Sequence, residues 1–512
     1  MSTQEYNLYA HFQSVFRQHP ERVAIESDSG ERTTFGEIDQ ISARMANWLH
    51  ASGVKPGDRV MVQVEKSVPA LLFYLACLRA GVVYVPLNTA YQAAELAYFI
   101  ANAEPRVFVC DPARETALRA ITEEQGVPTL VSLGADGQGS LLAAVQTQSS
   151  EQAVCSVKPD DLAAILYTSG TTGRSKGAQL THGNLTSNVH VLLNHWDWQA
   201  DDVLIHALPI FHVHGLFVAA HCALLNGSKM LWITKFQPAQ VLAWLPQATV
   251  FMGVPTLYVR LLQEAALTPA ACSHMRLFIS GSAPLLTETF VEWQARTGHT
   301  ILERYGMSET IMLTSNPCRP ADGERKGGTV GRPLPGVQVR CVDEQGAPCP
   351  AGDIGGIQVK GPNVFPGYWR MPEANAKEFT AEGWFRTGDV GRFDADGYIT
   401  IVGRSKDLII TGGYNVYPAE VEGYLNDLPG VAESAVIGCP HSDFGEGVVA
   451  VVVPQPGASL NAEQLTQTIK SQIAAFKVPK RLFVVDELPR NVMGKVQKNL
   501  LRDTYAKVFD AA

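Results

Sequence analysis

The sequence predicts an α/β protein with a large N-terminal part and a small α+β C-terminal domain. Its 512 residues, 46% of them apolar and 18% charged, suffice for two to four packed units at about 100–200 residues each. Helical and strand patterns alternate through the first half, which is typical of α/β folds. The pattern changes to short strands after about residue 327 and changes again after residue 404. We therefore expect a large domain over 1–403, β-rich over about 327–403, and a small domain over 404–512.

The first elements alternate between helix and strand. Residues 35–53 carry apolar side chains at three- and four-residue spacing and end on a glycine, which predicts a helix. A strand pattern over 57–64, a helical pattern over 68–79 and a strand pattern over 82–87 follow. Further apolar runs lead into Gly, Ser or Thr turns at 162–170, 248–256 and 275–285. Because ligands of open α/β sheets bind outside the carboxyl ends of the strands, we expect the chemistry at these turns.

The β-rich part and the C-terminal domain have patterns of their own. Short strands separated by Gly, Pro and Asp turns occupy 336–346, 355–361 and 384–403. After residue 404, helical patterns alternate with strand patterns, the helices over 418–430 and 460–476 and the strands over 433–440, 447–454 and 481–489. This order predicts a separate α+β domain.

Charge and cysteine usage exclude several classes of protein. The net charge of −9, from 50 acidic and 41 basic residues without a long Lys/Arg run, disfavours nucleic acid or an anionic membrane as partner.

The nine cysteines lie far apart without metal-ligand spacing, as expected of reduced thiols in a cytoplasmic protein. The first residues lack the pattern of an export signal, and the longest apolar stretch, 68–85, is interrupted by Pro69, Arg79 and Gly81. We expect no membrane span.

A glycine- and hydroxyl-rich loop over 167–177 follows the apolar strand pattern that ends at Leu166. Its small residues let backbone N–H groups approach phosphate oxygens, and Lys176 adds a positive charge. It is not a Walker A loop, because Gly173 is followed by Arg-Ser-Lys-Gly rather than by Lys and then Ser or Thr. The loop predicts a polyphosphate site made by Thr168, Ser169, Gly170, Thr171, Thr172, Gly173 and Lys176.

This loop resembles the phosphate-binding motif of adenylate-forming enzymes, the superfamily of acyl-CoA synthetases, luciferases and peptide-synthetase adenylation domains. Further motifs stand in that family's order at 305–309, 387–389, 403–407 and 489–497, so the resemblance covers nearly the whole chain. Segments such as PIFHVHGLFV (209–218) and LPRNVMGKVQK (488–498) make the whole chain most similar to malonyl-CoA synthetases. The resemblance implies an AMP-forming acid–thiol ligase that converts a short dicarboxylic acid, malonate and also methylmalonate, with MgATP to an acyl adenylate and pyrophosphate. The acyl group then passes to coenzyme A.

The resemblance also assigns roles to individual residues. Glu309, with Thr168, is expected to hold Mg²⁺ on the ATP phosphates, since this ion takes few carboxylates and completes its shell with phosphate and water. Asp389 is expected to accept both ribose hydroxyls, with Arg404 as its partner. Lys495, on a small mobile C-terminal domain, would neutralise the charge that builds when the carboxylate attacks phosphorus. Further expected positions are Ser282, Ala283, Glu303, Arg304, Tyr305 and Ser308 at the nucleotide, Lys406 at the hinge, and Gly412, Gly413 and Lys477 at coenzyme A.

The acyl pocket is expected near a His-Val-His segment. By resemblance His212 is the gate beside the pocket, His214 is a second imidazole and Met307 lines the wall, although either histidine can instead belong to a packed core. A dicarboxylate needs a buried cation for its distal carboxylate, because an unpaired buried anion is costly. Arg276 is the leading candidate for this cation, with Arg260 and Arg304 also considered.

Two other activities fit the same motifs. A fatty or aromatic acid–CoA ligase would have an apolar pocket without a cation at its end. An adenylating luciferase-like oxidase would share only the first step. The expected partners are small molecules, namely ATP, the acid and coenzyme A, and the sequence leaves monomer and homo-oligomer open.

Overall fold

The computed structural model describes residues 6–168, 175–412, 414–441, 443–491 and 494–510. The chain divides into two compact units. The first unit comprises Met1–Gln338 and Lys360–Gly383, and the second comprises Val339–Val359 and Trp384–Ala512. The α/β prediction is confirmed, whereas the division at residue 403 stays a prediction.

A six-stranded sheet forms one half of the first unit. Its strands are β3 (Arg59–Gln63), β4 (Val83–Pro86), β5 (Val107–Cys110), β6 (Thr129–Ser132), β7 (Leu162–Thr168) and β8 (Lys176–Thr181). The strand order is β6-β5-β3-β4-β7-β8, parallel except for the antiparallel pair β7 and β8. Buried Met61, Phe99, Phe108 and Ile165 belong to its core. The helices in this stretch of the chain are α4 (Ala93–Ala103), α5 (Glu115–Glu124) and α6 (Ser140–Val145).

A nine-stranded sheet forms the other half of the first unit. Its strands are β1 (Val23–Ser27), β2 (Arg32–Thr34), β9 (Val203–His206), β10 (Lys229–Trp232), β11 (Val250–Gly253), β12 (Leu277–Ser280), β13 (Leu302–Tyr305), β14 (Thr314–Ser315) and β15 (Arg332–Pro333). The order is β15-β14-β13-β12-β11-β9-β10-β1-β2, and the strands from β13 to β1 are parallel. Their register brings His206, Trp232, Gly253, Ser280 and Tyr305 to one edge, where ligands of such sheets bind.

Besides α4 to α6, the three helices at the N-terminal end and short 3-10 helices, the described part of the first unit contains seven helices. They are α7 (His182–His195), η3, a π-helix (His214–Ala220), α8 (His221–Asn226), α9 (Pro238–Trp244), α10 (Pro255–Leu262), α11 (Thr287–Thr297) and α12 (Pro372–Glu378).

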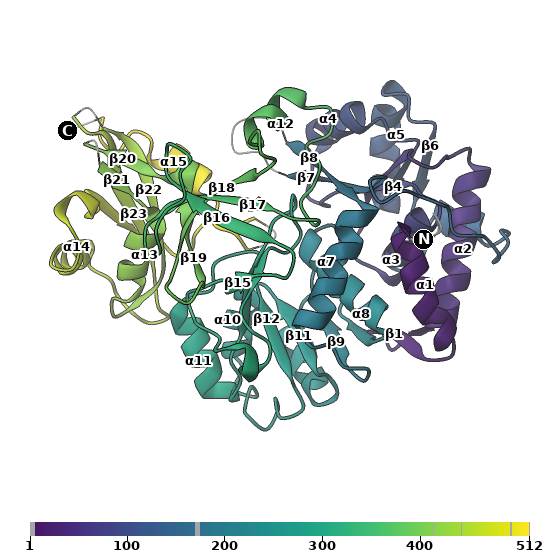
Figure 1. Ribbon diagram of the computed structural model, residues 1–512, viewed down its shortest axis with the longest axis horizontal. Helices are drawn as coiled ribbons and strands as arrows, with labels where there is room; N and C mark the ends of the chain where they lie inside the picture. The colour runs from purple at the N-terminus through teal and green to yellow at the C-terminus, as the bar shows by residue number, and fades with distance from the viewer. Residues whose placement is uncertain (1–5, 169–174, 413, 442, 492–493, 511–512) are drawn as a thin grey trace. The chain divides into compact units, whose positions relative to one another are not determined.

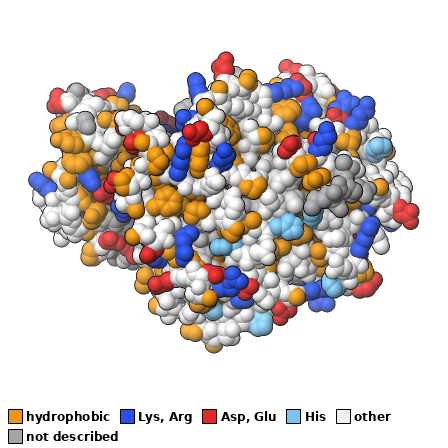
Figure 2. All heavy atoms as spheres, in the orientation of Figure 1, with side chains coloured by type: hydrophobic (Ala, Val, Ile, Leu, Met, Phe, Trp, Pro, Cys, Tyr) orange, Lys and Arg blue, Asp and Glu red, His pale blue; other side chains and the backbone are white. Residues whose placement is uncertain are grey.

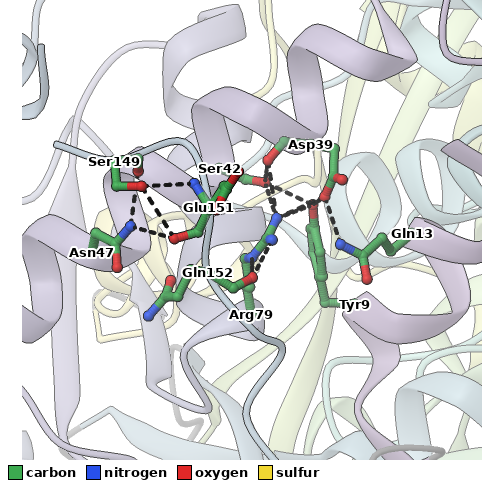
Figure 3. A network of polar contacts seen from close by, with 9 residues as sticks. All are labelled: Tyr9, Gln13, Asp39, Ser42, Asn47, Arg79, Ser149, Glu151 and Gln152. Carbon is green, nitrogen blue, oxygen red and sulfur yellow. Dashed lines mark hydrogen bonds and ion pairs between the residues drawn. The ribbon is translucent and has the colours of Figure 1, made fainter. Parts of the chain in front are cut away.

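Helices α1 (Leu8–Gln18), α2 (Phe35–Ala51) and α3 (Val68–Arg79) pack together at the N-terminal end of the first unit (Figure 1). Thr34 and Ser67 cap the starts of α2 and α3. At the end of α3, the Arg79 guanidinium pairs with Asp39 at 2.7 Å and donates to the Gln152 carbonyl (Figure 3). Because Arg79 is buried, this network fixes the three helices to the segment after α6.

The second unit contains two sheets. The first has the order β16-β17-β18-β19, and the second has the order β21-β20-β23-β22 with β24 beside β23. Their bounds are β16 (Gln338–Val342), β17 (Gly355–Lys360), β18 (Phe385–Phe393), β19 (Ile399–Arg404), β20 (Ile409–Thr411), β21 (Tyr414–Val416), β22 (Val431–His441), β23 (Gly445–Pro454) and β24 (Arg481–Val484). Buried Ile409, Val436, Val448 and Val452 form one core of the second sheet, which carries α13 (Pro418–Asn426), α14 (Ala462–Lys470) and α15 (Lys498–Tyr505).

The surface and the thiols agree with the composition. On the face drawn in Figure 2, acidic and basic side chains are interspersed. All nine cysteines carry free thiols. Among the described helices, none has the length and apolar character needed to cross a bilayer.

Candidate active site

The two strands that flank the phosphate loop form an antiparallel pair. Thr168, at the end of β7, lies opposite Lys176, at the start of β8, and its hydroxyl donates to the Lys176 carbonyl at 3.4 Å. The structure therefore describes both ends of the loop. The predicted loop residues Ser169, Gly170, Thr171, Thr172 and Gly173 lie outside the described residues.

Lys176 is held by a segment far along the chain. Its Nζ lies 3.0 Å from Oε1 of Glu378, at the end of α12, and 4.7 Å from the centre of the Tyr368 ring. The Tyr368 segment pairs with β8 through a bridge to Ala178, and Trp369 donates its N–H to the Gly177 carbonyl at 2.8 Å. Sequence reasoning missed Tyr368 and Glu378, because no local spacing links them to Lys176.

Glu309, the predicted Mg²⁺ ligand, is buried after β13 and only 5% exposed. The Tyr368 hydroxyl donates to its Oε1 at 2.9 Å. Tyr368 therefore contacts both the lysine and the carboxylate expected at the ATP phosphates. A single carboxylate fits Mg²⁺ on a triphosphate, since phosphate oxygens and water supply the other ligands. Thr168 as a second ligand stays a prediction.

The predicted nucleotide residues follow β12 and β13. Ser282 adopts φ +72°, an uncommon conformation for a non-glycine residue, in the turn after β12. Glu303 on β13 accepts the Leu285 N–H at 3.2 Å, and burial raises the pKa of its carboxyl to about 8. Ala283, Tyr305 and Ser308 are partly exposed at the same strand ends.

Arg304 is a buried cation at this edge. It is 2% exposed, and its Nε and Nη2 groups have no hydrogen-bond partner among the described residues. A Cβ atom on Gly281 would lie 2.6 Å from the guanidinium carbon, so only glycine allows the guanidinium to lie on this backbone. Since an unpaired buried charge is costly, Arg304 is suited to an anionic ligand.

His214 lies beside Arg304 and Ser282. The Nδ1 atom of His214 is 3.2 Å from the Ser282 hydroxyl. The backbone N–H of His214 donates to Nδ1 of His212 at 3.3 Å. Burial, followed by the charge of Arg304, holds the pKa of His214 well below its ordinary value. The structure thus brings His212, His214, Ser282 and Arg304 together at the carboxyl ends of the strands. Met307, partly exposed, follows β13 in the next turn.

Arg276 does not belong to this group. It precedes β12, so it lies at the amino end of the strand whose carboxyl end leads to Ser282. Its Nη2 and Nε bind both oxygens of Asp202, at 2.5 and 3.1 Å, and Nη1 donates to the Trp196 carbonyl. Ser280 lies four residues along the strand from Arg276, about 13 Å at 3.3 Å per residue. Contrary to expectation, Arg276 is therefore committed to Asp202, at the end of β12 opposite to the one that leads to Ser282.

The second unit carries the remaining predicted residues. Asp389 on β18 and Arg404 on β19 are cross-strand partners, with Oδ1 and Nε 3.2 Å apart. The Lys495 N–H donates to the Asn491 side chain at 3.0 Å, and its carbonyl accepts the Asn491 N–H at 2.9 Å. Burial lowers the pKa of Lys406 in the short helix η6 (Ser405–Asp407).

The residues predicted at coenzyme A also lie in the second unit. Gly412 donates its N–H to the Phe444 carbonyl at 2.9 Å, and Lys477 pairs with Glu420 at 2.6 Å. Gly413 lies outside the described residues.

Comparison with known proteins gives the family. The family model for the AMP-binding enzyme matches residues 12–369, and that for the AMP-binding enzyme C-terminal domain matches residues 420–495. The chain is 36% identical to the mitochondrial malonate–CoA ligase of Homo sapiens, covering 95% of this chain and 89% of that protein. It is 37% identical to a feruloyl-CoA synthase of Amycolatopsis, covering 95% and 96%.

A solved structure agrees along the whole chain. The ATP-bound MatB from Rhodopseudomonas palustris is 53% identical, covers 99% of this chain and 100% of its own, and superposes with a TM-score of 0.95. The predicted fold class and family resemblance are both confirmed. The chain belongs to the AMP-binding, adenylate-forming enzyme family.

Proposed function

We propose that the protein is an AMP-forming malonate–CoA ligase. In its first step a malonate carboxylate oxygen attacks the α-phosphorus of ATP, giving malonyl adenylate and pyrophosphate. In its second step the thiol of coenzyme A attacks the malonyl carbonyl, giving malonyl-CoA and AMP. The observation that carries the proposal is the buried Arg304 guanidinium beside His214, and the relatives named malonate–CoA ligase support it.

Arg304 accounts for the choice of a dicarboxylic acid. One carboxylate must face the α-phosphorus, so the second needs a cation inside the pocket. A charge-assisted hydrogen bond to Arg304 is worth about 1.5–3 kcal/mol, whereas an apolar tail would leave the guanidinium buried and unpaired. Methylmalonate has the same two carboxylates, and we propose it as a second substrate.

The adenylation step is proposed to use the following predicted residues. Lys176 and Glu309, joined through Tyr368, are proposed to bind the phosphates and their Mg²⁺. Mg²⁺, when bound, neutralises phosphate charge. Lys495 is proposed to stabilise the charge that builds at the α-phosphate during attack. Asp389 is proposed to accept the ribose hydroxyls, with Arg404 holding its carboxylate.

The thiol-transfer step is proposed to follow a rotation at Lys406. Gly412, Gly413 and Lys477 would then serve coenzyme A. We further propose that the enzyme works in the cytoplasm on small molecules only, as a monomer or homo-oligomer.

A pyrophosphate-release screen tests the function. The acids are malonate, methylmalonate, octanoate, benzoate and ferulate, each with and without coenzyme A, because one relative is a feruloyl-CoA synthase. We expect kcat/KM for malonate to exceed that for each monocarboxylate by about 100-fold or more, since two unfavourable effects add against the apolar tail. Equal turnover of octanoate or ferulate would replace the malonate proposal with a fatty or aromatic acid–CoA ligase. Oxygen uptake without coenzyme A would instead indicate an oxidase.

A further inference from the structure

Two buried groups of the first unit have no part in the chemistry above. Lys66 and His206 are 8% and 1% exposed. Lys66 follows β3 of the six-stranded sheet, and His206 ends β9 of the nine-stranded sheet. Both lie against the ring of Trp232, at the end of β10. Through these contacts the segment after β3 meets the carboxyl ends of β9 and β10, at the edge where the pocket residues lie.

Lys66 holds the ends of two neighbouring strands. Its Nζ donates to the carbonyl of His206 at 2.8 Å and to that of Ile233 at 2.7 Å, and it lies 4.3 Å from the centre of the Trp232 ring. The His206 carbonyl is the last of β9, and the Ile233 carbonyl is the first after β10. Because breaking such buried bonds would leave polar groups unpaired, Lys66 fixes where the two strands end.

His206 connects its strand end to the π-helix η3. Its ring stacks on Trp232 with centroids 4.6 Å apart, and its Nε2 lies 2.8 Å from the Gly215 carbonyl. A carbonyl only accepts, so Nε2 carries the proton. Burial and then the charge of Lys66 hold the pKa of His206 well below its ordinary value, which keeps the imidazole neutral.

The start of η3 has no room to shift. A Cβ on Gly215 would lie 2.1 Å from the Pro209 carbonyl oxygen, so the helix rests directly on that carbonyl. Gly215 follows His214, whose Nδ1 contacts Ser282, and His212 stands two residues earlier. π-helical turns are frequent at functional sites. A displacement of Gly215 would therefore move both histidines of the pocket.

We propose that His206 is a positioning residue for acid binding: its Nε2–H fixes Gly215, and so holds His214, which also bonds His212, against Ser282 and Arg304. Lys66 supports it by fixing the end of β9. This inference rests on the proposed function for the identity of the acid. It assigns His206 no contact with substrate, so its effect is on the affinity for the acid.

The test compares KM values for malonate and ATP in pyrophosphate release. His206→Phe keeps a ring on Trp232 and removes the donor. We expect it to raise the KM for malonate about 10-fold while the KM for ATP changes less than about two-fold, in line with the effect of groups that orient a ligand-binding residue. His206→Gln, which restores an N–H near Nε2, should return the KM for malonate to within about three-fold of the wild-type value.

A matched control comes from the same core. The Tyr74 hydroxyl and Nε2 of the fully buried His221 form a hydrogen bond of 2.7 Å that does not involve the Gly215 carbonyl. Tyr74→Phe removes this bond and should leave both KM values unchanged. A parallel rise in both KM values for His206→Phe, or a rise for Tyr74→Phe as large as that for His206→Phe, would overturn the positioning role.

Folding and substrate identity are controlled separately. If His206→Phe does not fold, as judged by its thermal transition, Lys66→Met takes its place. We expect the same rise in the KM for malonate with little change in the KM for ATP. An equal change in both KM values refutes the inference. If the wild type prefers another acid, the malonate proposal fails, and the positioning role is judged on the KM of that acid.

Discussion

At the scale of single residues, two arginines beside the same strand have different roles. Arg304 is buried with unpartnered N–H groups among the described residues, whereas Arg276 is committed to Asp202. We expect Arg304→Met to lower kcat/KM for malonate about 10- to 100-fold, because a charged hydrogen bond is lost. Arg276→Met should lower the thermal transition and leave the KM for malonate unchanged. Steady-state kinetics with malonate and a melting curve for each variant check this, and a large malonate defect in Arg276→Met would contradict the placement.

His182 predicts a pH dependence of stability. It is fully buried and accepts the Leu8 N–H at Nδ1 over 3.2 Å, and burial lowers its pKa to about 4. The unfolded chain binds the proton near pH 6.5, so stability is fully present above that pH and is lost as the pH falls towards 4. The loss is about 3 kcal/mol. Denaturant unfolding between pH 4 and 7.5 should show it in the wild type and show about 3 kcal/mol less pH dependence in His182→Asn, which cannot titrate. Equal slopes would exclude His182 as the cause.

At the scale of elements, the Tyr368 segment joins two predicted phosphate-site residues. Tyr368→Phe removes the donor to Glu309 but keeps the ring beside Lys176. We expect the KM for MgATP to rise about five- to ten-fold and the KM for malonate to stay constant, because one hydrogen bond to a charged carboxylate is lost. Tyr258→Phe, which removes an equally buried bond to the Ile279 carbonyl, is the control and should change neither. An unchanged KM for MgATP would show that Tyr368 does not position Glu309.

Elements with local signals could be predicted from the sequence, and elements held by distant contacts could not. The helices predicted over 35–53 and 68–79 are α2 (Phe35–Ala51) and α3 (Val68–Arg79), because their caps and apolar spacing are local. The helix predicted over 460–476 ends at Lys470, where the Ser471 hydroxyl bonds the Thr468 carbonyl.

Distant contacts also limited how much of the candidate site could be predicted from the sequence. The motif order pointed to Ser282, Glu303, Arg304 and His214, which the structure places together. The motif order did not distinguish the role of Arg304 from that of Arg276. The sequence alone does not show that Arg276 lies at the amino end of its strand and Arg304 near the carboxyl end of the next one. The bridge between Ala178 and Tyr368 joins residues far apart in the chain, and no residue spacing in the sequence indicates this pairing.

At the scale of the whole molecule, we expect the two proposed half-reactions to be separable by substitution. Lys495→Ala should abolish malonyl adenylate formation and spare thioester formation from prepared malonyl adenylate, because its charge is needed only while phosphorus is attacked. Each half-reaction is measured alone. Lys498→Ala, which removes a neighbouring lysine paired with Glu422, should affect neither. Equal loss of both half-reactions in Lys495→Ala would refute its assignment.

Two substitutions at Lys406 test the proposed rotation between the two reaction steps. Lys406→Pro fixes φ at the hinge, so adenylation should persist while transfer to coenzyme A falls by about 100-fold or more. Lys406→Ala, without the backbone restraint, should retain both steps. Wild-type overall turnover by Lys406→Pro would show that no rotation occurs there.

The path of the chain between the units limits how the protein can be divided. The chain leaves the first unit after Gln338, returns at Lys360 and leaves again after Gly383. The returning segment carries Tyr368 and Glu378, which contact Glu309 and Lys176. A gene fragment that ends at residue 338 therefore loses these partners, and one that extends to 383 includes part of the second unit. Recombination between relatives can exchange the first unit as a whole only through two separate stretches of the gene.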